Sequence, residues 1–413
     1  MNPSDRRTFL KVAAGTMTGI ALEPTLSAAP ILRIADHPVA IVGVGRQGRS
    51  IIAELQKIDG VSIAALCDVD PSRLRGGARR APQAKQYAEV GELLSGSPEV
   101  ESVFVSTPTH LHKDIVLQAL AAGKHVYVEA PLAHTIEDAR AIADAARGTD
   151  RVVQAGLLGR SNPVYSLART FYKSEAMRRV VSMRAIANKK TSWRSPSPDP
   201  AREKARNWAL DPELSLGLAG EWGTHQFDVF HWYTGEYPTS ISGGGGVVAW
   251  DDGRTVADTI DVTCRFPSGT SLQYQATLGN SYEGRVEMFH GINSAIKLTW
   301  SHGWMFKEAD ASTQGWEVYA NRQRFHNDEG ITLIAEATQL AAQGKLKDGV
   351  GLPHDSLYYG IGDFLKSVTE KAPVTTSIEE GYRATVIGIL ANRAVTTGTT
   401  VTVDPALLKS RSS

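Results

Sequence analysis

The stretch Gly43-Val44-Gly45-Arg46-Gln47-Gly48 follows directly after the apolar run at residues 38–42, and it decides the fold of this chain. Apolar side chains at helical spacing come next, at Ile51, Ile52 and Leu55. The pattern predicts a tight glycine turn between a buried strand and the start of a helix. Backbone amides in such a turn, aided by the positive end of the helix dipole, bind phosphate groups.

A second apolar run, residues 61–67, ends at Asp68. An acidic side chain at this point of a βαβ unit accepts hydrogen bonds from an adenosine ribose and repels a 2′-phosphate. We therefore expect a dinucleotide, NAD in preference to NADP. Arg73 and Arg75 could accommodate a 2′-phosphate, so NADP stays a possible cofactor. The alternative to a dinucleotide site is a purely structural glycine turn. The residues expected to bind the dinucleotide here are Gly43, Gly45, Arg46, Gln47, Gly48 and Asp68.

Strand and helix patterns alternate between residues 36 and 155. The predicted strands are 39–43, 62–67, 86–88, 103–106, 125–128 and 152–155, and the predicted helices are 46–57, 91–94, 112–122 and 136–146. Apolar runs buried on both faces and joined by helices specify a parallel sheet. The fold class is therefore α/β, and residues 36–155 are expected to form a Rossmann domain with a doubly wound parallel sheet.

The pattern changes beyond residue 155. A helix at 164–173 and a strand at 180–187 lead into a Pro- and Ser-rich loop at 191–200. Later segments alternate with a period of two or show helical spacing. The former, predicted as strands, are 240–250, 259–266, 271–278, 285–290 and 295–300, and the latter, predicted as helices, are 331–343, 355–370 and 378–397. Residues 156–408 are therefore expected to form an α+β domain with a large, mostly antiparallel sheet.

Composition narrows the possible partners. The 44 basic and 44 acidic residues cancel, so nothing in the charge balance favours nucleic acid or an anionic membrane. Two cysteines, Cys67 and Cys264, are too few for a disulfide framework, and we expect both to be buried free thiols.

The first 29 residues are expected to be an export signal. Residues 5–11 (Asp-Arg-Arg-Thr-Phe-Leu-Lys) resemble a twin-arginine signal, a weakly apolar stretch follows, and small residues precede Pro30. Glu23 interrupts the apolar part, which argues against a permanent membrane anchor. The sequence thus predicts a periplasmic or otherwise exported protein, and a disordered basic tail is the alternative.

Two further motifs fall where predicted strands end, at the edge of the sheet that faces ligands in open α/β folds. Thr107, Pro108 and His112 follow the fourth strand, and Glu129 and Pro131 follow the fifth. We expect all five beside the cofactor, with Glu129 orienting its ribose or carboxamide. For His112, capping or packing is the alternative.

A glycine-rich segment leads into a predicted helix that carries Glu221, His225 and Asp228. The spacing places both carboxylates on or near the face of His225, an arrangement suited to proton transfer. A structural histidine and a metal site are the alternatives, although no further His or Cys cluster supports a metal. We expect catalysis at these three residues and no metal.

Aromatic and basic side chains between the predicted strand 180–187 and the glycine-rich segment are expected to line a sugar-sized pocket. Aromatic faces stack on pyranose rings, while Lys and Arg donate hydrogen bonds to hydroxyl groups. The candidates are Lys189, Lys190, Trp193, Arg194 and Trp208.

Together these motifs resemble the glucose–fructose oxidoreductase, inositol dehydrogenase and rhizopine-catabolism (GFO/IDH/MocA) family, from about residue 36 to the C-terminus. The resemblance implies the two domains above, oxidation of a sugar or cyclitol hydroxyl by hydride transfer to a nicotinamide, and homo-oligomers that pair through the second domain's open sheet. It also implies that His225 is the catalytic histidine. Glu221 stands where the family usually has aspartate, which keeps the carboxylate.

One position departs from the family pattern. The family usually has Glu-Lys-Pro where this chain has Glu129-Ala130-Pro131, and a methyl group cannot transfer a proton. Either His225 works alone, or Lys189 or Lys190 reaches in, or the chemistry differs. We therefore expect an exported NAD(P)-dependent oxidoreductase acting on a sugar, glycoside or cyclitol; the alternatives are a redox-neutral, NAD-dependent glycosidase and a non-catalytic binding protein.

Overall fold

The computed structural model describes residues 32–409 except positions 175, 316, 318–319, 326–327, 336, 338–339, 341–342 and 346–349. The export signal expected at residues 1–29 therefore lies outside the described residues. No helix in the described part of the chain is long and apolar enough to cross a membrane.

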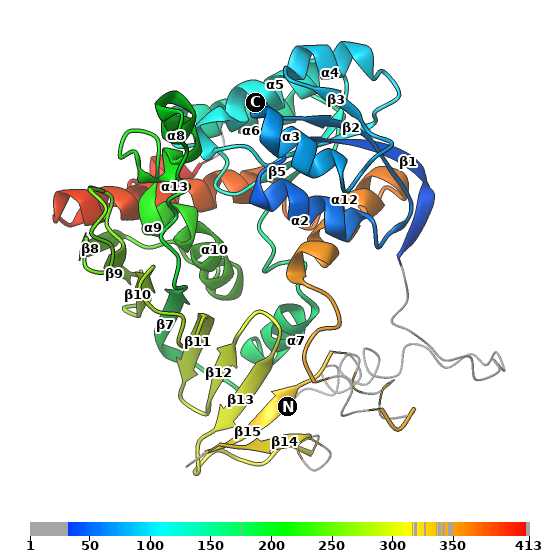
Figure 1. Ribbon diagram of the computed structural model, residues 1–413. Coiled ribbons are helices and arrows are strands. Elements are labelled where there is room, and N and C mark those ends of the chain that lie inside the picture. The colour runs from blue at the N-terminus through cyan, green and yellow to red at the C-terminus, as the bar shows by residue number, and fades with distance from the viewer. Residues whose placement is uncertain are drawn as a thin grey trace.

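The first domain contains a six-stranded parallel sheet (Figure 1). Its strands are β1 (Arg33–Val42), β2 (Asp59–Cys67), β3 (Lys85–Tyr87), β4 (Ser102–Val105), β5 (His125–Glu129) and β6 (Val153–Gly156). They pair in the order β3-β2-β1-β4-β5-β6, which is the doubly wound order whose ligand crevice opens between β1 and β4. The predicted Rossmann sheet is confirmed.

The helices of this domain come from two distant parts of the chain. They are α2 (Arg46–Leu55), α3 (Pro71–Ala78), α4 (Val90–Gly96), α5 (His112–Ala121), α6 (Ile136–Arg147) and α12 (Ser356–Thr369). Helix α12 lies beside α2 (Figure 1) and also packs on β1 and β5. Its Phe364 belongs to one buried cluster with Ile41 and Phe104. A late segment, which the sequence pattern placed in the second domain, thus covers the first sheet.

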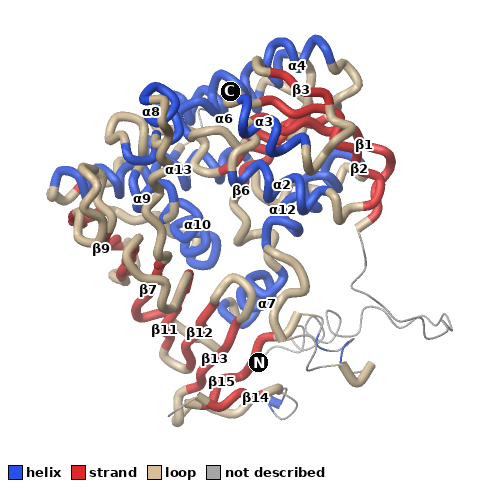
Figure 2. Tube along the Cα trace, viewed as in Figure 1, coloured by secondary structure: helices blue, strands red, loops and turns tan. Residues whose placement is uncertain are grey.

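The second domain is built on a ten-stranded sheet (Figure 2). Its strands are β7 (Val180–Asn188), β8 (Ser240–Gly246), β9 (Thr259–Arg265), β10 (Ser271–Thr277), β11 (Arg285–Gly291), β12 (Ser294–Leu298), β13 (Gly303–Lys307), β14 (Arg322–Arg324), β15 (Glu329–Leu333) and β16 (Val401–Thr402). The order is β14-β15-β13-β12-β11-β7-β10-β9-β8-β16, with β7 and β10 parallel and the other pairs antiparallel. The predicted mostly antiparallel sheet is confirmed.

Helices connect this sheet to the first domain. They are α7 (Pro163–Tyr172), α8 (Pro200–Arg206), α9 (Gly217–Glu221), α10 (Gly223–Thr234) and α13 (Ile378–Thr397). Helix α13 contacts α9, α10 and β8 of the second domain and α6 and β6 of the first. Because this helix packs against both domains, it fixes the edge of the parallel sheet relative to α9 and α10.

Two local predictions were wrong, and several elements were not predicted. Residues 331–333, expected in a helix, belong to β15, because pairing with β13 and β14 overrides the local apolar spacing; the remainder of that predicted helix lies partly outside the described residues. The strand expected at 240–250 ends at Gly246. The sequence pattern also missed α3, α8, β13, β14 and β16. Both cysteines are buried and free, as predicted.

Candidate active site

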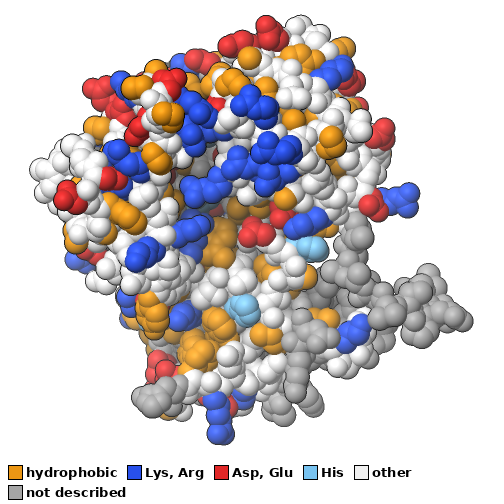
Figure 3. All heavy atoms as spheres, viewed as in Figure 1, with side chains coloured by type: hydrophobic (Ala, Val, Ile, Leu, Met, Phe, Trp, Pro, Cys, Tyr) orange, Lys and Arg blue, Asp and Glu red, His pale blue; other side chains and the backbone are white. Residues whose placement is uncertain are grey.

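A cleft of about 1590 Å³ opens where β1, β2 and β4 end, and residues 191–222 line its opposite side. Basic side chains gather around the hollow in the space-filling view (Figure 3). They belong to Arg46, Arg49, Arg73, Arg79, Arg80, Arg194, Arg202, Lys204 and Arg206. This excess of positive charge favours an anionic ligand.

The glycine turn at the head of α2 has the shape that a pyrophosphate needs. A Cβ on Gly43 (φ +89°) would lie 2.7 Å from the Ser106 backbone, and one on Gly48 would lie 2.0 Å from the Gly43 carbonyl oxygen. A Cβ on Gly45 would meet nothing within 4 Å. Two glycines therefore allow close packing, and the third leaves space over the helix N-terminus for a phosphate group. The residues present fit a dinucleotide.

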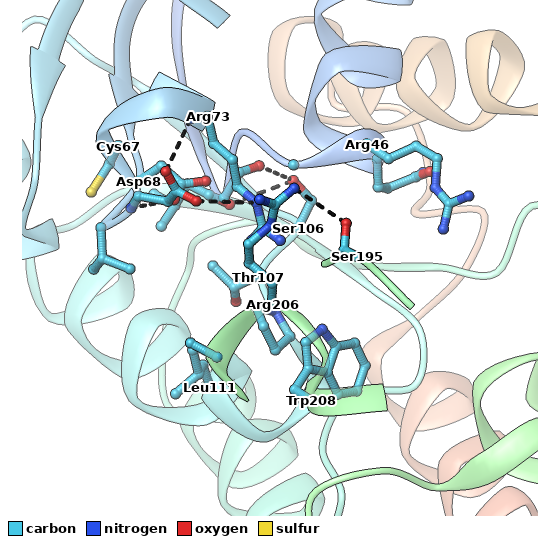
Figure 4. A pocket seen from close by; sticks show the side chains of 18 of the residues that line it. Arg46, Cys67, Asp68, Arg73, Ser106, Thr107, Leu111, Ser195, Arg206 and Trp208 are labelled. Carbon is cyan, nitrogen blue, oxygen red and sulfur yellow. Dashed lines mark hydrogen bonds and ion pairs between the residues drawn. The ribbon is translucent and has the colours of Figure 1, made fainter. Parts of the chain in front are cut away.

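Asp68 lies at the end of β2 in this cleft, as expected (Figure 4). Its Oδ2 accepts a hydrogen bond from the Val44 amide and its Oδ1 one from the Asp70 amide, both at 2.8 Å. The amides hold the carboxylate still while leaving each oxygen a further lone pair for a ribose hydroxyl. Arg73 lines the cleft, whereas Arg75 is exposed and is not among the lining residues.

The loops after β4 and β5 are tied together by His112. Its Nε2 lies 2.9 Å from the Thr107 carbonyl oxygen and its Nδ1 lies 3.1 Å from that of Pro131. Burial lowers the pKa of His112 to about 4, so the ring is neutral and its single N–H donates to one of these two carbonyl oxygens while the ring packs between the loops. This favours the packing role. Thr107 lines the cleft beside Pro108, and its buried Oγ1 has no partner among the described residues.

Glu129 faces the glycine turn. Its Oε1 accepts a hydrogen bond from Gln47 Nε2 at 2.9 Å, and burial raises the pKa of Glu129 to about 7. A carboxyl group in this state can accept or donate a hydrogen bond near neutral pH, which suits a group that meets the ribose or carboxamide. The peptide bond between Ala130 and Pro131 is cis.

A short bridge crosses the cleft from the second domain. Arg202 of α8 donates hydrogen bonds to both carboxylate oxygens of Asp70 at 3.0 Å and another to Ser72. Asp70 is also the N-cap of α3, and these contacts hold its pKa well below the usual range. No sequence pattern predicted this contact, because no helix was expected at residues 200–206, directly after the predicted loop. The bridge spans the side of the cleft that holds Asp68.

The three expected catalytic residues do not form one cluster. The predicted helix breaks at Trp222, and Glu221 ends α9, where it accepts hydrogen bonds from Thr109 Oγ1 (2.9 Å) and the Leu216 amide (3.1 Å). Burial raises the pKa of Glu221 to about 7. Asp228 is buried and binds Arg160 through both oxygens. The expectation that Asp228 orients His225 was therefore wrong.

His225 stands in the first turn of α10 with its buried Nδ1 unpartnered within the described part of the chain. Burial and the charge of Arg285 lower its pKa, and a hydrogen bond to the Ala130 backbone opposes the shift. The ring is thus neutral at physiological pH and has a nitrogen free to take a proton. His225 lies one turn beyond Glu221 and Trp222, which line the cleft.

The expected sugar-binding residues divide into two groups. Trp193, Arg194 and Trp208 line the cleft, and Trp193 meets Trp222 edge to face at 5.5 Å. Lys189 and Lys190 are exposed and lie outside the lining, because their amides pair with the Thr277 carbonyl and Ser281 Oγ beyond the ends of β7 and β10. The structure does not bring either lysine to His225.

The sequence patterns did not predict the side chains that neighbour His225 in the second domain. The ring of Trp300 meets that of His225 nearly at right angles. Arg285 and Glu287, both on β11, contact the Trp300 side chain. The signal lay only in the alternation of β11, which places residues 285 and 287 on one face. In the described ranges, no group of three or more His, Cys, Asp or Glu could hold a metal ion.

The Rossmann crevice, its glycine turn and the neutral histidine define a dinucleotide-dependent oxidoreductase. The chain belongs to the GFO/IDH/MocA family, since a model described as the oxidoreductase family with an NAD-binding Rossmann fold matches residues 38–157 and the GFO/IDH/MocA C-terminal domain matches residues 182–293. Its cofactor is NAD.

Two relatives named as dehydrogenases align with most of this chain. It is 25% identical over 353 residues to levoglucosan dehydrogenase of Pseudarthrobacter phenanthrenivorans, covering 78% of this chain and 84% of that protein. It is 25% identical over 361 residues to myo-inositol 2-dehydrogenase of Thermotoga maritima, covering 86% and 96%. A glycosyl hydrolase family 109 protein of Shewanella amazonensis is 33% identical over 172 residues, only 38% of its length.

Solved structures share the fold. Levoglucosan dehydrogenase in complex with NADH and L-sorbose superposes with a TM-score of 0.71 at 19% identity, over 90% of this chain and all of that one.

Proposed function

We propose that this protein oxidises a secondary hydroxyl group of a sugar, anhydrosugar or cyclitol, with His225 as the base. The observation that carries the proposal is the neutral His225 ring, whose buried Nδ1 has no partner among the described residues. The names of the relatives, levoglucosan dehydrogenase and myo-inositol 2-dehydrogenase, support this substrate class. Aromatic lining by Trp193, Trp208 and Trp222 suits the apolar face of a ring.

When bound, the nicotinamide supplies the hydride acceptor. Gly43, Gly45 and Gly48 would hold the pyrophosphate, and Asp68 would hold the adenosine ribose. We assign the removal of the hydroxyl proton to His225, because the Nδ1 of its neutral ring has no partner among the described residues and is open to a proton. Glu221 shapes the cleft wall by joining α9 to Thr109 after β4.

The test follows NADH absorbance and released sugar together, with purified protein, NAD and a panel of free sugars, anhydrosugars, cyclitols and glycosides. NADH that accumulates with substrate, and is lost in His225→Ala, supports the proposal. Failure to reduce NAD with any member of the panel would contradict it.

A redox-neutral glycosidase is the second candidate. Two observations favour it. One is the partial match to a glycosyl hydrolase family 109 protein. The other is Ala130, whose backbone lies beside His225 and whose methyl side chain cannot transfer a proton as the family's usual lysine can. In the same assay, free sugar in large excess over NAD without NADH accumulation would select this activity.

We further propose that the protein is exported and forms homo-oligomers. Residues 5–11 support twin-arginine export. Side chains such as Thr263, Gln273 and Gln275 leave the outer face of the ten-stranded sheet polar and available to a second copy. Cell fractionation tests the first proposal, and light scattering tests the second.

A further inference from the structure

Arg285 forms no direct ion pair among the described residues, although its charge acts on the neighbouring Glu287. It opens β11 and is partly exposed, and its guanidinium carbon lies 4.7 Å from the centroid of the Trp300 ring. A guanidinium stacked on an indole is held in position while its edge N–H groups stay free to donate. Such a group is equipped to bind an oxygen of a ligand.

Trp300, which holds Arg285, is fixed from three directions. Its backbone N donates to Tyr165 Oη at 3.2 Å, its carbonyl accepts from Asn162 Nδ2 at 2.6 Å, and its indole Nε1 donates to Glu287 Oε1 at 3.2 Å. Its φ of +66° is a conformation that aromatic residues rarely adopt. Strained backbone of this kind persists where the surroundings enforce it, and it gathers at functional sites.

Glu287 anchors this arrangement from the protein interior. It is fully buried, and its second oxygen accepts a hydrogen bond from Tyr165 Oη. Because Glu287 and Arg285 are two residues apart on β11, both side chains lie on the face of the sheet toward α10. The carboxyl group thus orients the indole, and the indole orients the guanidinium.

His225 completes the group. Its ring meets that of Trp300 nearly at right angles, with 6.5 Å between centroids, and the charge of Arg285 acts on it. On its other side lies the backbone of Ala130. Arg285, like Lys189 and Lys190, is not among the residues that line the cleft, but it is the cation whose charge acts on His225.

We propose that Arg285 is a further catalytic residue, which donates to the substrate oxygen as His225 removes its proton. This inference rests on the proposed oxidation. The O–H proton passes to His225, the C–H bond gives up its electron pair as the hydride that NAD accepts, and a carbonyl group forms. Negative charge develops on the oxygen during this step, and a fixed cation in a partly buried site stabilises it. Trp300 and Glu287 are positioning residues for that cation.

The variants Arg285→Gln and Arg285→Lys test the proposal, with Arg184→Gln as the matched control, because Arg184 is exposed on the adjacent strand β7. On a substrate that the wild type oxidises, we expect Arg285→Gln to lower kcat about 100-fold or more, the size of effect seen when one such donor is removed. Arg285→Lys should keep part of the rate, Arg184→Gln should keep all of it, and NADH binding should be unchanged in all three.

Two readouts separate catalysis from a structural role. The His225 Cε1–H signal, assigned by comparison with His225→Ala, should titrate at higher pH in Arg285→Gln than in the wild type, with no substrate present. Guanidinium ion added to Arg285→Ala should restore part of the rate, which it would not do for a packing defect.

The outcomes are distinct. Suppose that the wild type oxidises a substrate, that the kcat of Arg285→Gln stays within twofold of the wild-type kcat, and that the His225 titration does not shift. This result would overturn the inference about Arg285 and leave the proposed function standing. A wild type that oxidises nothing in the panel overturns the proposed function, and the role of Arg285 with it. If Arg285→Gln does not fold, Arg285→Lys decides: full wild-type rate and titration overturn the inference.

Discussion

Arg160 binds Asp228 through two guanidinium nitrogens, with Nη2 2.7 Å and Nε 2.9 Å from the carboxylate oxygens. Both side chains are nearly enclosed, at 10% and 1% exposure, and Glu380 of α13 also accepts from Arg160 at 3.1 Å. The pair therefore joins the loop after β6 to α10 and α13. Asp228, which the sequence pattern placed beside His225, instead belongs to the contact that holds α10 against its neighbouring elements.

Removing one charge of this pair should destabilise the protein. Asp228→Asn leaves Arg160 with Glu380 as its remaining carboxylate, and breaking a buried pair in this way costs about 3 kcal/mol. We expect the free energy of unfolding in urea to fall by that amount, with NADH affinity retained. Asp261→Asn, an exposed carboxylate on β9, is the control. Loss of turnover in Asp228→Asn without loss of stability would restore a direct catalytic role for Asp228.

Two glycines of the turn should respond differently to alanine. Gly48→Ala places a Cβ 2.0 Å from a backbone oxygen, so the protein should unfold far more readily or fail to fold. Gly45→Ala meets no protein atom, so its stability should stay within about 0.5 kcal/mol of the wild type. Because that Cβ enters the space kept for the pyrophosphate, NADH affinity should fall about tenfold or more. Thermal unfolding and NADH fluorescence titration measure the two effects; unchanged affinity in Gly45→Ala would place the pyrophosphate elsewhere.

The sequence predicts the parts of this site that local patterns encode. The glycine turn and Asp68 occur within one βαβ unit, so their spacing alone places them at one edge of the sheet. The contacts of His225 depend on elements far apart in the chain: Ala130 follows β5, Arg285 opens β11, and Trp300 follows β12. Only the register of the second sheet and the break at Trp222 bring them together, and neither has a sequence signature. The Arg160–Asp228 pair and the packing of α12 on the first sheet could not be predicted for the same reason, because both join segments far apart in the chain.

Buried Glu287 should make stability depend on pH. Burial raises its pKa from 4.5 to about 7. Below about pH 4.5 both folded and unfolded chains hold the proton; between 4.5 and 7 only the folded chain holds it, so stability falls as pH rises, by up to about 1.4 kcal/mol per pH unit. Between pH 5 and 8 the wild type should therefore lose about 3 kcal/mol more than Glu287→Gln.

Urea unfolding at pH 5, 6, 7 and 8 measures this difference. Glu129 and Glu221 shift in the same direction, but they are present in both proteins and cancel in the comparison. Glu308→Gln, at an exposed position, is the control and should follow the wild-type curve. Parallel curves for the wild type and Glu287→Gln would show that Glu287 is ionised in the folded protein throughout this range.

The bridge from Arg202 to Asp70 should slow the release of cofactor. Arg202 joins α8 to the N-terminus of α3 across the side of the cleft that holds Asp68, so we expect this contact to obstruct the release of an adenosine bound at Asp68. Arg202→Gln should raise the NADH dissociation rate about two- to fivefold, a modest change because the arginine is partly exposed. Its thermal stability should stay close to that of the wild type.

Stopped-flow displacement of NADH measures this rate, and salt provides a second check. Raising ionic strength should speed release from the wild type more than from Arg202→Gln, because salt screens the ion pair that the variant lacks. Arg184→Gln, which keeps the bridge, should show the wild-type rate and salt response. Equal dissociation rates in the wild type and Arg202→Gln at low salt would mean that α8 does not hold the cofactor in place.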